Sequence, residues 1–280
     1  MYPPTADVVE TVSRRRELLE ALAAGPQRKR DLVEQLACSR STVDRAIREL
    51  ERFEFIERAE SGYRLTAAGQ LVFEEFSRTT ETFAAIGEAS QVLAAIPREA
   101  PMSPAFLKDA TVSEPKPHAP NAPLQELAAS FETATRVRGT SAAERLPETR
   151  DRLYHRSIEE DLSVEAILTP DLADFLFKSY PGQAYGVLNH GDFEIYEIES
   201  LPYELTIVEQ PEGCQLFLFA LNDRAEIEGV IKNDTQAALE WAESVFDELR
   251  AAASPLVPPD RSEMESEAAS LDMDRSESRD

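Results

Sequence analysis

Three arginines in the segment 39–58 share one side of an expected helix, where their side chains could donate hydrogen bonds together. The segment reads SRSTVDRAIRELERFEFIER, and Arg45, Arg48 and Arg52 stand at positions i, i+3 and i+7. We call these three residues the arginine face. A guanidinium group can donate to O6 and N7 of guanine, and the hydroxyl groups that precede the arginines can reach phosphates or base edges.

The opposite side of the same segment is apolar. Its apolar residues recur at i, i+3, i+4 and i+7, and they are Val43, Ala46, Ile47 and Leu50. This pattern predicts an amphipathic helix over residues 41–52, with one face buried and the arginine face in solvent. Because Glu49 and Glu51 interleave with the arginines, an ordinary solvated helix is the alternative interpretation.

The neighbouring segments predict a winged helix-turn-helix over residues 1–78. Three elements are expected upstream. The first is a helix in RRRELLEALAAGP, which ends at Gly25 and Pro26. A short second helix in RKRDLVEQL and a turn in ACSRS follow it. Downstream, a hairpin through Ser61 and Gly62 is expected in FIERAESGYRLT. Such a fold places one helix in the major groove and the wing beside the next groove or the backbone. The candidate DNA-binding residues are Arg40, Ser41, Thr42, Arg45, Arg48, Arg52, Arg58 and Arg64, with Arg14, Arg15 and Arg16 as candidates for phosphate contacts.

The charge of the chain is unevenly distributed. Its 280 residues include 53 Asp and Glu against 29 Lys and Arg, a formal net charge of -24. Residues 1–78 hold 13 basic and 14 acidic residues, so nearly all of the excess negative charge follows them. The N-terminal segment is therefore where an anion can approach, which favours double-stranded DNA as the partner. A winged helix that binds another protein is the alternative, and it predicts exposed apolar residues in place of the arginine face.

Lysine is scarce, since only five of the basic residues are lysine. An acidic, lysine-poor chain is typical of halophile proteins, whose carboxylates keep the surface hydrated in strong salt, although an acidic protein of an ordinary cytoplasm is the alternative. No run approaches 18 uncharged apolar residues and no charged-then-apolar leader is present, so we expect a cytoplasmic protein without a membrane span. Cys38 and Cys214 lie too far apart in the sequence to suggest a disulfide framework or a zinc site.

The stretch LVEQLACSRSTVDRAIRELERFEFIERAESGYRLTAAGQ carries a family resemblance. Over about residues 12–75 the chain resembles the winged helix-turn-helix of archaeal transcription regulators of the ArsR/MarR-like kind. The resemblance implies that the helix from SRSTV reads DNA and that IER and GYRLT form the wing. Two departures stand out. The family often has Gly where Glu54 stands, and a non-Gly residue costs about 1 kcal/mol there if the backbone is left-handed. The second helix also lacks a Ser or Thr cap before RKRDL.

Composition divides the rest of the chain. Residues 79–97 predict a connecting helix rich in Ala and Glu, and seven prolines from Pro97 to Pro123 predict an extended connector or an irregular entry into a second domain. Residues 98–253 alternate between helical and strand-like patterns, whereas 254–280 form an acidic tail that we expect to be disordered. The predicted fold class is α+β, with an N-terminal winged helix-turn-helix, a linker or dimerisation helix and a C-terminal mixed α/β sheet domain.

The second domain is expected to contain six strands, TATRVRGT, SVEAILT, FEIYEIE, YELTIVE, QLFLFAL and AEIEGVIK. Helices are expected in LPETRDRLYHRSIEE and PDLADFLFKSY, and in a closing helix that Thr235 caps. Ligands of such sheets lie at the carboxyl ends of strands, where the pattern places Gly139. The candidate effector-binding residues are Arg136, Arg138, Tyr154, His155, Tyr185 and His190. The alternative is that these arginines pair with the surplus carboxylates.

Four stretches of this domain carry a second resemblance: PKPHAPNAPLQEL, RVRG, LYHRSIEEDLSVEAILTPDL and LPYELTIVE. Over about residues 105–250 they are similar to the sensor-like domain of archaeal regulators named after a methanogenesis regulatory protein. The resemblance implies a two-part transcription factor that is cytoplasmic and dimeric, and it identifies no effector.

A homodimer is also expected from the helix between Phe73 and Ile96. This helix carries more apolar surface than a linker helix can hide in a monomer, from Phe76, Phe83, Ile86, Leu93 and Ile96. The alternative is that the helix packs back on its own second domain.

No catalytic or metal-binding motif accompanies these features. None of the three histidines has a second His or Cys at ligand spacing, and the sequence has no GxSxG, GxxxxGK[ST] or GxGxxG. We therefore expect no metal, no cofactor and no enzymatic activity. The sequence predicts a DNA-binding transcription regulator modulated by its C-terminal domain, and a winged-helix protein-interaction module is the alternative.

Overall fold

The computed structural model describes residues 4–258 apart from residues 117, 120, 161 and 189–191. The chain forms two compact units, residues 1–84 and 85–280. The first is mainly helical and the second contains a mixed sheet, so the predicted α+β class is confirmed. The start of the predicted disordered tail, residues 254–280, is wrong, because Ser254 and Pro255 form a strand that pairs with Glu197 and Tyr196. From residue 259 onward the predicted tail lies outside the described residues. None of the described helices is long and apolar enough to cross a membrane.

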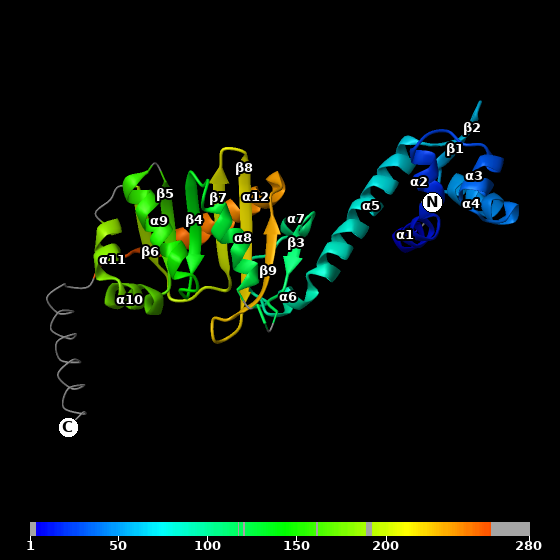
Figure 1. The fold of residues 1–280 in the computed structure, drawn as a ribbon. Coiled ribbons are helices and arrows are strands. Elements are labelled where there is room, and N and C mark those ends of the chain that lie inside the picture. Colours follow the sequence, from blue (N-terminus) through cyan, green and yellow to red (C-terminus); the bar gives the residue numbers. More distant parts are fainter. Residues whose placement is uncertain (1–3, 117, 120, 161, 189–191, 259–280) are drawn as a thin grey trace, which may run out of the picture. The chain divides into compact units, whose positions relative to one another are not determined.

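The first unit packs its helices around one apolar core. Its elements are α1 (Thr5–Arg14), α2 (Arg16–Ala23), α3 (Lys29–Gln35), α4 (Arg40–Arg52), β1 (Ile56–Ala59), β2 (Gly62–Leu65) and most of α5 (Ala67–Glu88) (Figure 1). The apolar stripe of α4 is at most 3% exposed and joins this core. The predicted RRRELLEALAAGP helix differs, because the backbone breaks at Arg15 (φ -111°) and divides the segment between α1 and α2.

The backbone at the end of α4 takes a conformation at position 54 that favours glycine, although the residue there is Glu54. Glu54 has a φ of 59°, in the left-handed region. The N–H of Phe55 donates to the carbonyl oxygen of Leu50 at 3.0 Å, and the N–H of Glu54 to that of Glu51 at 3.0 Å, which together form a Schellman motif. Glycine adopts this backbone without strain, so Glu54 carries a conformational cost.

A glycine lets the wing approach the preceding loop. Gly62 has a φ of 139°, and a Cβ built there would lie 2.1 Å from the carbonyl oxygen of Gln27. Tyr63 and Gln27 exchange two backbone hydrogen bonds of 2.9 and 2.8 Å, which tie the wing to the segment before α3. The hairpin turn was expected at Ser61 and Gly62, but Gly62 already pairs with Ala59 as the first residue of β2, so the turn lies one residue earlier.

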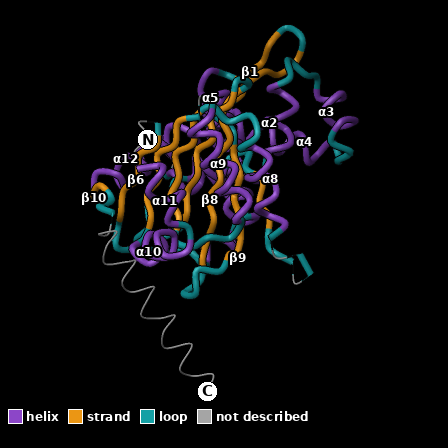
Figure 2. Tube along the Cα trace, turned by 60° about the vertical axis from the view of Figure 1, so that its left-hand side comes forward, coloured by secondary structure: helices purple, strands orange, loops and turns teal. Residues whose placement is uncertain are grey.

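The second unit is built on an eight-stranded mixed sheet in the described residues, in the order β10-β6-β5-β4-β7-β8-β9-β3. The neighbours β4, β5 and β6 run parallel, and the remaining neighbours run antiparallel. Figure 2 shows these strands side by side as one continuous sheet. The strands are β3 (Thr111–Ser113), β4 (Arg136–Ser141), β5 (Ser163–Leu168), β6 (Phe193–Glu197), β7 (Glu204–Gln210), β8 (Gly213–Leu221), β9 (Ile227–Asn233) and β10 (Ser254–Pro255).

Helices cover both faces of the sheet, with α8 and α9 in front and α12 behind in the view of Figure 1. Side chains alternate across each strand, so β7 sends Val208 into the core beneath α8 and α9 and Ile207 into the core beneath α12. The helices of the front face are α8 (Ala122–Ser130), α9 (Pro147–Glu159), α10 (Pro170–Ser179) and α11 (Pro181–Leu188). Those of the other face are α6 (Ser90–Ala94), α7 (Pro104–Leu107) and α12 (Gln236–Ala252).

The six expected strands correspond to β4–β9, and Thr235 caps α12 by accepting from the N–H of Ala238 at 3.3 Å. Of the two alternatives expected from Pro97 to Pro123, the extended connector is wrong and the irregular entry into the second domain is confirmed. This segment forms α7, with Pro104 in its first turn, and the edge strand β3. Asn233 donates to the carbonyl oxygens of Phe106 and Lys108, both at 2.8 Å, and so fixes the segment to the sheet. Sequence reasoning also missed α11.

The region expected to form a connecting helix, residues 79–97, is not one element. Most of it belongs to α5, which begins at Ala67, and Ala89 and Val92 are buried in the core of the second unit. The apolar residues on which the dimer prediction depends are therefore divided. Phe76 packs against the core of the first unit, whereas Leu93 and Ile96 pack against that of the second. Phe83 is 67% exposed and Ile86 is 36% exposed, and Leu71 of the same helix is also 67% exposed.

Candidate functional site

The first turn of α4 gathers hydroxyl groups at its N-terminus. Ser39 is the N-cap, and its Oγ accepts from the N–H of Thr42 at 3.2 Å. The same Oγ lies 2.8 Å from the hydroxyl oxygens of Ser41 and of Thr42. α4 therefore begins one residue earlier than expected, and its free N–H groups and exposed hydroxyls lie where a helix attracts anions such as phosphate.

The arginine face is exposed and lacks carboxylate partners. Arg45, Arg48 and Arg52 lie in solvent, as does Arg40 in the first turn. Among the described residues, none of these four guanidinium groups forms an ion pair. Arg52 lies over the ring of Phe53, with 5.1 Å from its guanidinium carbon to the ring centroid. The donors of the face are thus available to another molecule.

Two of the three acidic residues of α4, Asp44 and Glu49, form hydrogen bonds with basic residues outside the arginine face. Asp44 Oδ1 accepts from Lys29 Nζ at 2.6 Å, and Glu49 Oε2 accepts from Arg15 Nε at 2.9 Å. These hydrogen bonds lower the pKa of both carboxyl groups. The pairing corrects the expectation for Arg15, whose side chain is 12% exposed and which ties the start of α2 to α4 rather than standing free for a phosphate.

The other candidate DNA-binding residues of the first unit differ in whether their side chains already pair with another residue. Arg14 lies 3.6 Å from Glu10 in an exposed pair, and Arg16 is exposed. In the wing, Arg58 donates from Nε to the hydroxyl oxygen of Tyr63 at 3.2 Å and remains exposed. Arg64 pairs with Glu57 across the hairpin at 2.7 Å, so it would have to exchange this partner to contact DNA.

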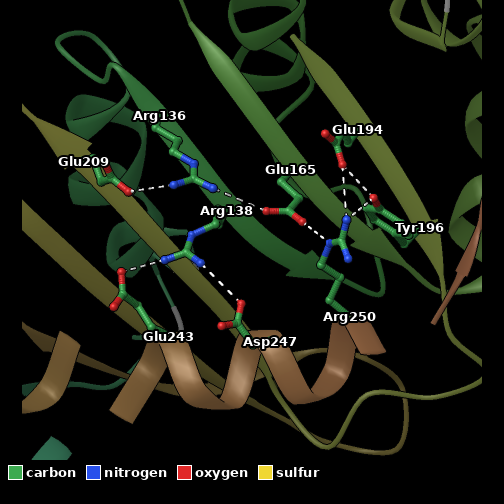
Figure 3. A network of polar contacts seen from close by, with 9 residues as sticks. All are labelled: Arg136, Arg138, Glu165, Glu194, Tyr196, Glu209, Glu243, Asp247 and Arg250. Atoms are coloured by element: carbon green, nitrogen blue, oxygen red, sulfur yellow. Dashed lines mark hydrogen bonds and ion pairs between the residues drawn. The ribbon is translucent and has the colours of Figure 1, made fainter. Parts of the chain in front are cut away.

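The two arginines proposed for an effector site lie on the α12 face of the sheet (Figure 3). Arg138 is 6% exposed, and its guanidinium lies 2.8 Å from Glu243 and 3.6 Å from Asp247, both on α12. Arg136 lies 3.6 Å from Glu209 and 3.7 Å from Glu165. The same network includes Arg250, which pairs with Glu165 and Glu194 and also donates to the hydroxyl of Tyr196.

The other proposed effector residues do not join these arginines. Tyr154, on α9, lines a cavity on the opposite face of the sheet. His155 is exposed and lies 3.7 Å from Glu159, and Tyr185 packs its ring 5.1 Å from that of Phe177. His190 lies outside the described residues. The predicted set is therefore wrong as one site, because strand alternation points Arg136 and Arg138 toward α12 while α9 and α11 cover the other face.

That opposite face holds a cavity of about 270 Å³ along the parallel strands β4 and β5, from Val137 and Val164 to the carboxyl ends. Gly139 contributes to its wall from the middle of β4 rather than from the strand end. Apolar side chains make most of the lining, among them Leu146, Leu153, Leu172, Phe177 and Phe219. The polar residues of the lining are Glu144, Arg145, Thr149, Arg150, Tyr154, Tyr180, Gln183, Glu204 and Thr206, with Thr140 and Ser141 of β4 and Glu165 of β5.

In one ion pair of this cavity, between Arg145 and Glu204, the charged groups already have hydrogen-bond partners within the protein. Arg145 Nη1 lies 2.8 and 2.6 Å from the two carboxylate oxygens of Glu204, and Nη2 donates to the carbonyl oxygen of Ala225 at 2.7 Å. Glu204 also accepts from the N–H of Ala142 at 2.6 Å. This pair closes the loop after β4 and offers little to a ligand.

A second polar cluster is incompletely hydrogen-bonded. Arg150 stacks on Tyr180, 3.4 Å from the ring centroid, and its Nη2 donates to Asp151 at 2.6 Å. Its Nη1 lies 2.8 Å from Glu144 Oε1, yet neither of these atoms has a well-directed hydrogen bond within the described residues. Arg150 Nε and Gln183 Oε1 are likewise buried without a hydrogen-bond partner there. Burial raises the pKa of Glu144, and the nearby charge of Arg150 opposes that rise.

The sequence held no signal for this cluster. Glu144 and Arg145 lie in a loop between a strand and a helix, and Gln183 lies on α11, the helix that sequence reasoning missed. Only the packing of α9, α10 and α11 on the parallel strands brings these side chains together.

Two family models match separate parts of the chain. Residues 5–88 match the model described as the HVO_A0261 N-terminal domain. Residues 120–252 match the model described as the middle domain of the methanogenesis regulatory protein FilR1, as the resemblance of the C-terminal stretches predicted. The second unit thus resembles a domain of a regulatory protein. A search of curated proteins finds no match.

Several solved structures are similar at low identity. TrmBL2, described as an archaeal chromatin protein with a novel mode of DNA binding, is 15% identical with a TM-score of 0.43 over 90% of this chain and 100% of that one. The phospholipase D family member Nuc from Salmonella typhimurium is 11% identical, with a TM-score of 0.37 over 53% and 99%. Polyphosphate kinase from Porphyromonas gingivalis is 11% identical, with a TM-score of 0.36 over 65% and 29%. These TM-scores are too low to establish a shared fold.

Proposed function

We propose that the protein is a DNA-binding transcription regulator that reads the major groove with α4. The observation that carries this proposal is the exposed arginine face, which has no carboxylate partner among the described residues of a chain with a net charge of -24. In so acidic a protein, free guanidinium groups on one side of a helix favour an anionic partner. The match of residues 120–252 to a regulatory-protein domain supports the same role.

Each part of the first unit has a task in this proposal. Arg45 and Arg48 donate to guanine edges, and Arg40, Ser41 and Thr42 hold phosphates at the N-terminus of α4. Arg58 reaches the backbone or a neighbouring groove from the wing, while Arg52 contacts DNA from the last turn of α4. The pairs of Lys29 with Asp44 and of Arg15 with Glu49 keep acidic groups from competing for the arginine face.

We further propose an ArsR/MarR-like regulator of a halophilic archaeon that acts in the cytoplasm as a homodimer, has no enzymatic activity and responds to an effector through its second unit. Two-fold symmetry suits a palindromic operator with half-sites one or more DNA turns apart. The exposed Leu71 and Phe83 of α5 are the apolar residues that a partner protomer would cover. Light scattering in molar salt tests this arrangement, and a monomer mass would refute it.

A winged helix that binds a protein instead of DNA is the competing function. Such a surface would present large apolar side chains on α3 or α4. The large hydrophobic side chains that are exposed in the described residues lie elsewhere, at Val9, Leu71, Phe83, Ile86, Phe175 and Val257. This distribution favours DNA as the partner.

Genome-wide occupancy by chromatin immunoprecipitation in the source cell tests the proposed function. We expect enrichment at discrete promoters that share a sequence motif, and binding of the purified protein to that motif in fluorescence anisotropy. Occupancy without any common motif, together with no binding of naked DNA, would favour the protein-interaction module.

A further inference from the structure

The cavity of the second unit contains polar groups that the fold itself leaves without hydrogen bonds. Arg150 Nε and Gln183 Oε1 are buried without a hydrogen-bond partner in the described residues, and Glu144 Oε1 and Arg150 Nη1, an ion pair 2.8 Å apart, form no well-directed hydrogen bond there. All three side chains line the same cavity. Folded proteins hydrogen-bond nearly all of their buried polar atoms, so a cluster of such atoms around one cavity indicates a site that another molecule completes.

The chemistry of the four atoms specifies the polar end of that molecule. The two Arg150 nitrogens are donors, whereas the Glu144 and Gln183 oxygens are acceptors. A complementary group must therefore accept one hydrogen bond and donate another. A carboxamide or a hydroxyl group meets both demands, but an ester or an ether can only accept.

The charges around the cavity argue against an ionised ligand. Arg145 is neutralised by Glu204, and Arg150 lies between Glu144 and Asp151, so these five residues carry one negative charge in excess. A carboxylate ligand would add a negative charge beside Glu144, and an ammonium would meet the guanidinium of Arg150. A carboxylate would also leave water for a largely apolar cavity without gaining an opposite charge, which is costly, and an ammonium has no lone pair to accept a hydrogen bond from Arg150.

We propose that this cavity binds a small, uncharged, largely apolar molecule whose polar end both donates and accepts hydrogen bonds at Glu144, Arg150 and Gln183. The apolar body packs against the aliphatic and aromatic wall, and a cavity of about 270 Å³ accommodates only a small ligand. The cavity extends to the carboxyl ends of β4 and β5, where ligands of parallel strands commonly bind. The inference names the class of ligand for the effector role proposed above. The effector role rests on the proposed function, whereas the binding of the ligand to the cavity does not.

The binding test uses the full-length protein in high salt without DNA. Isothermal titration compares hexanamide with three ligands of the same chain length: hexanoate, hexylamine and methyl hexanoate. We expect hexanamide to bind most tightly, since it alone pairs with donors and acceptors without a net charge. No detectable binding of hexanamide, or equal binding of hexanoate, would overturn the proposal.

Three variants locate the binding. Gln183→Leu removes one acceptor at similar size and should weaken hexanamide by about threefold to tenfold, the effect of one hydrogen bond. Ala184→Leu adds bulk to the lining and should abolish binding. The matched control is Arg152→Leu, two residues beyond Arg150 on α9, whose side chain pairs with Glu132 instead of lining the cavity. Unchanged affinity in both Gln183→Leu and Ala184→Leu would refute this site.

A separate measurement distinguishes failure of this inference from failure of the proposed function. Anisotropy of operator DNA is recorded with wild type and with Gln183→Leu, each with and without hexanamide. We expect hexanamide to change the affinity of wild type for DNA, and to do so less in the variant. Normal DNA binding without any hexanamide binding would overturn only the ligand site, whereas hexanamide binding without any DNA binding would overturn only the proposed function.

Discussion

The arginines of α4 and those of β4 each lie on one face of their own element, yet the two sets have opposite surroundings. On α4, Arg45 and Arg48 are exposed and form no ion pair in the described residues. On β4, Arg138 is 6% exposed and pairs with Glu243 and Asp247, while Arg136 lies between Glu165 and Glu209. The first set can serve another molecule, whereas the second holds α12 and the neighbouring strands together.

The difference lies in where the carboxylates are directed. The packing of α12 on the sheet places acidic side chains directly over β4. Next to the arginine face, by contrast, Asp44 and Glu49 are bound by Lys29 and Arg15. On α4, two of the three nearby acids are thus kept from the arginine face by other basic residues, whereas on β4 the nearby acids pair with the arginines themselves.

The largest effect is expected from removing the arginine face. Arg45→Ala and Arg48→Ala should each lose about 1–3 kcal/mol of discrimination for the operator, which is about fivefold to 150-fold in relative affinity. Melting should be unchanged, because neither side chain packs in the core. Gel shifts with a recovered operator measure the loss, with Arg152→Ala as a control outside the first unit. Wild-type binding by both variants would remove these residues from the reading face.

For the β4 arginines we expect a loss of stability with unchanged DNA binding, the reverse of the result for the arginine face. Arg138→Ala should lower the free energy of unfolding by about 1.5–3 kcal/mol, since it removes charge-assisted hydrogen bonds and the contact with Phe246. DNA affinity should stay unchanged. Arg136, which is 44% exposed and pairs only at 3.6 and 3.7 Å, provides the comparison, and Arg136→Ala should cost less than 1 kcal/mol by the usual ~0–1 kcal/mol range of exposed pairs. Urea unfolding measures both, and equal costs would show that burial does not separate the two arginines.

A smaller and opposite change is expected at the end of α4. Glu54→Gly should raise the free energy of unfolding by about 1 kcal/mol, because the left-handed backbone at this position costs a non-Gly residue that amount. Glu51→Gly, in the last turn of the same helix, should instead destabilise by about 0.5–1 kcal/mol. Chemical unfolding of the two variants gives the comparison, and a loss of stability in Glu54→Gly would contradict the assigned strain.

The smallest effect is expected from salt. Phosphate contacts release counterions, so affinity should fall as salt rises, while screening relieves the repulsion between DNA and the acidic second unit. At 1 M salt the Debye length is about 3 Å, so long-range forces of both signs are nearly absent. We expect a shallow net dependence of the dissociation constant between low and molar salt. A steep, continuous loss of binding would mean that the arginine contacts outweigh the acidic repulsion.

Local patterns in the sequence were enough to predict much of the fold. The stripe of Val43, Ala46, Ile47 and Leu50 predicted the buried face of α4, and Thr235 predicted the cap of α12. The strands β4–β9 follow from short runs of β-branched and aromatic residues. Each of these features depends on residues within one or two turns or one strand of each other. Local patterns did not predict α7 and β3 between Pro97 and Pro123, because these elements depend on contacts that are distant in the sequence. Asn233 holds α7, and β9 pairs with β3.

The sequence by itself determined which side of α4 is apolar and which carries arginine, because helical periodicity is a local property of neighbouring residues. Only the tertiary structure decided which arginines have partners, since the acids that bind Arg138 lie more than 100 residues away on α12. The same holds for the cavity: Glu144, Arg150 and Gln183 come from a loop and two helices that meet only when the sheet is complete. Side-chain alternation on β4 then separates Arg138 from that cavity, although Arg138 and the cavity-lining Gly139 are adjacent in the chain.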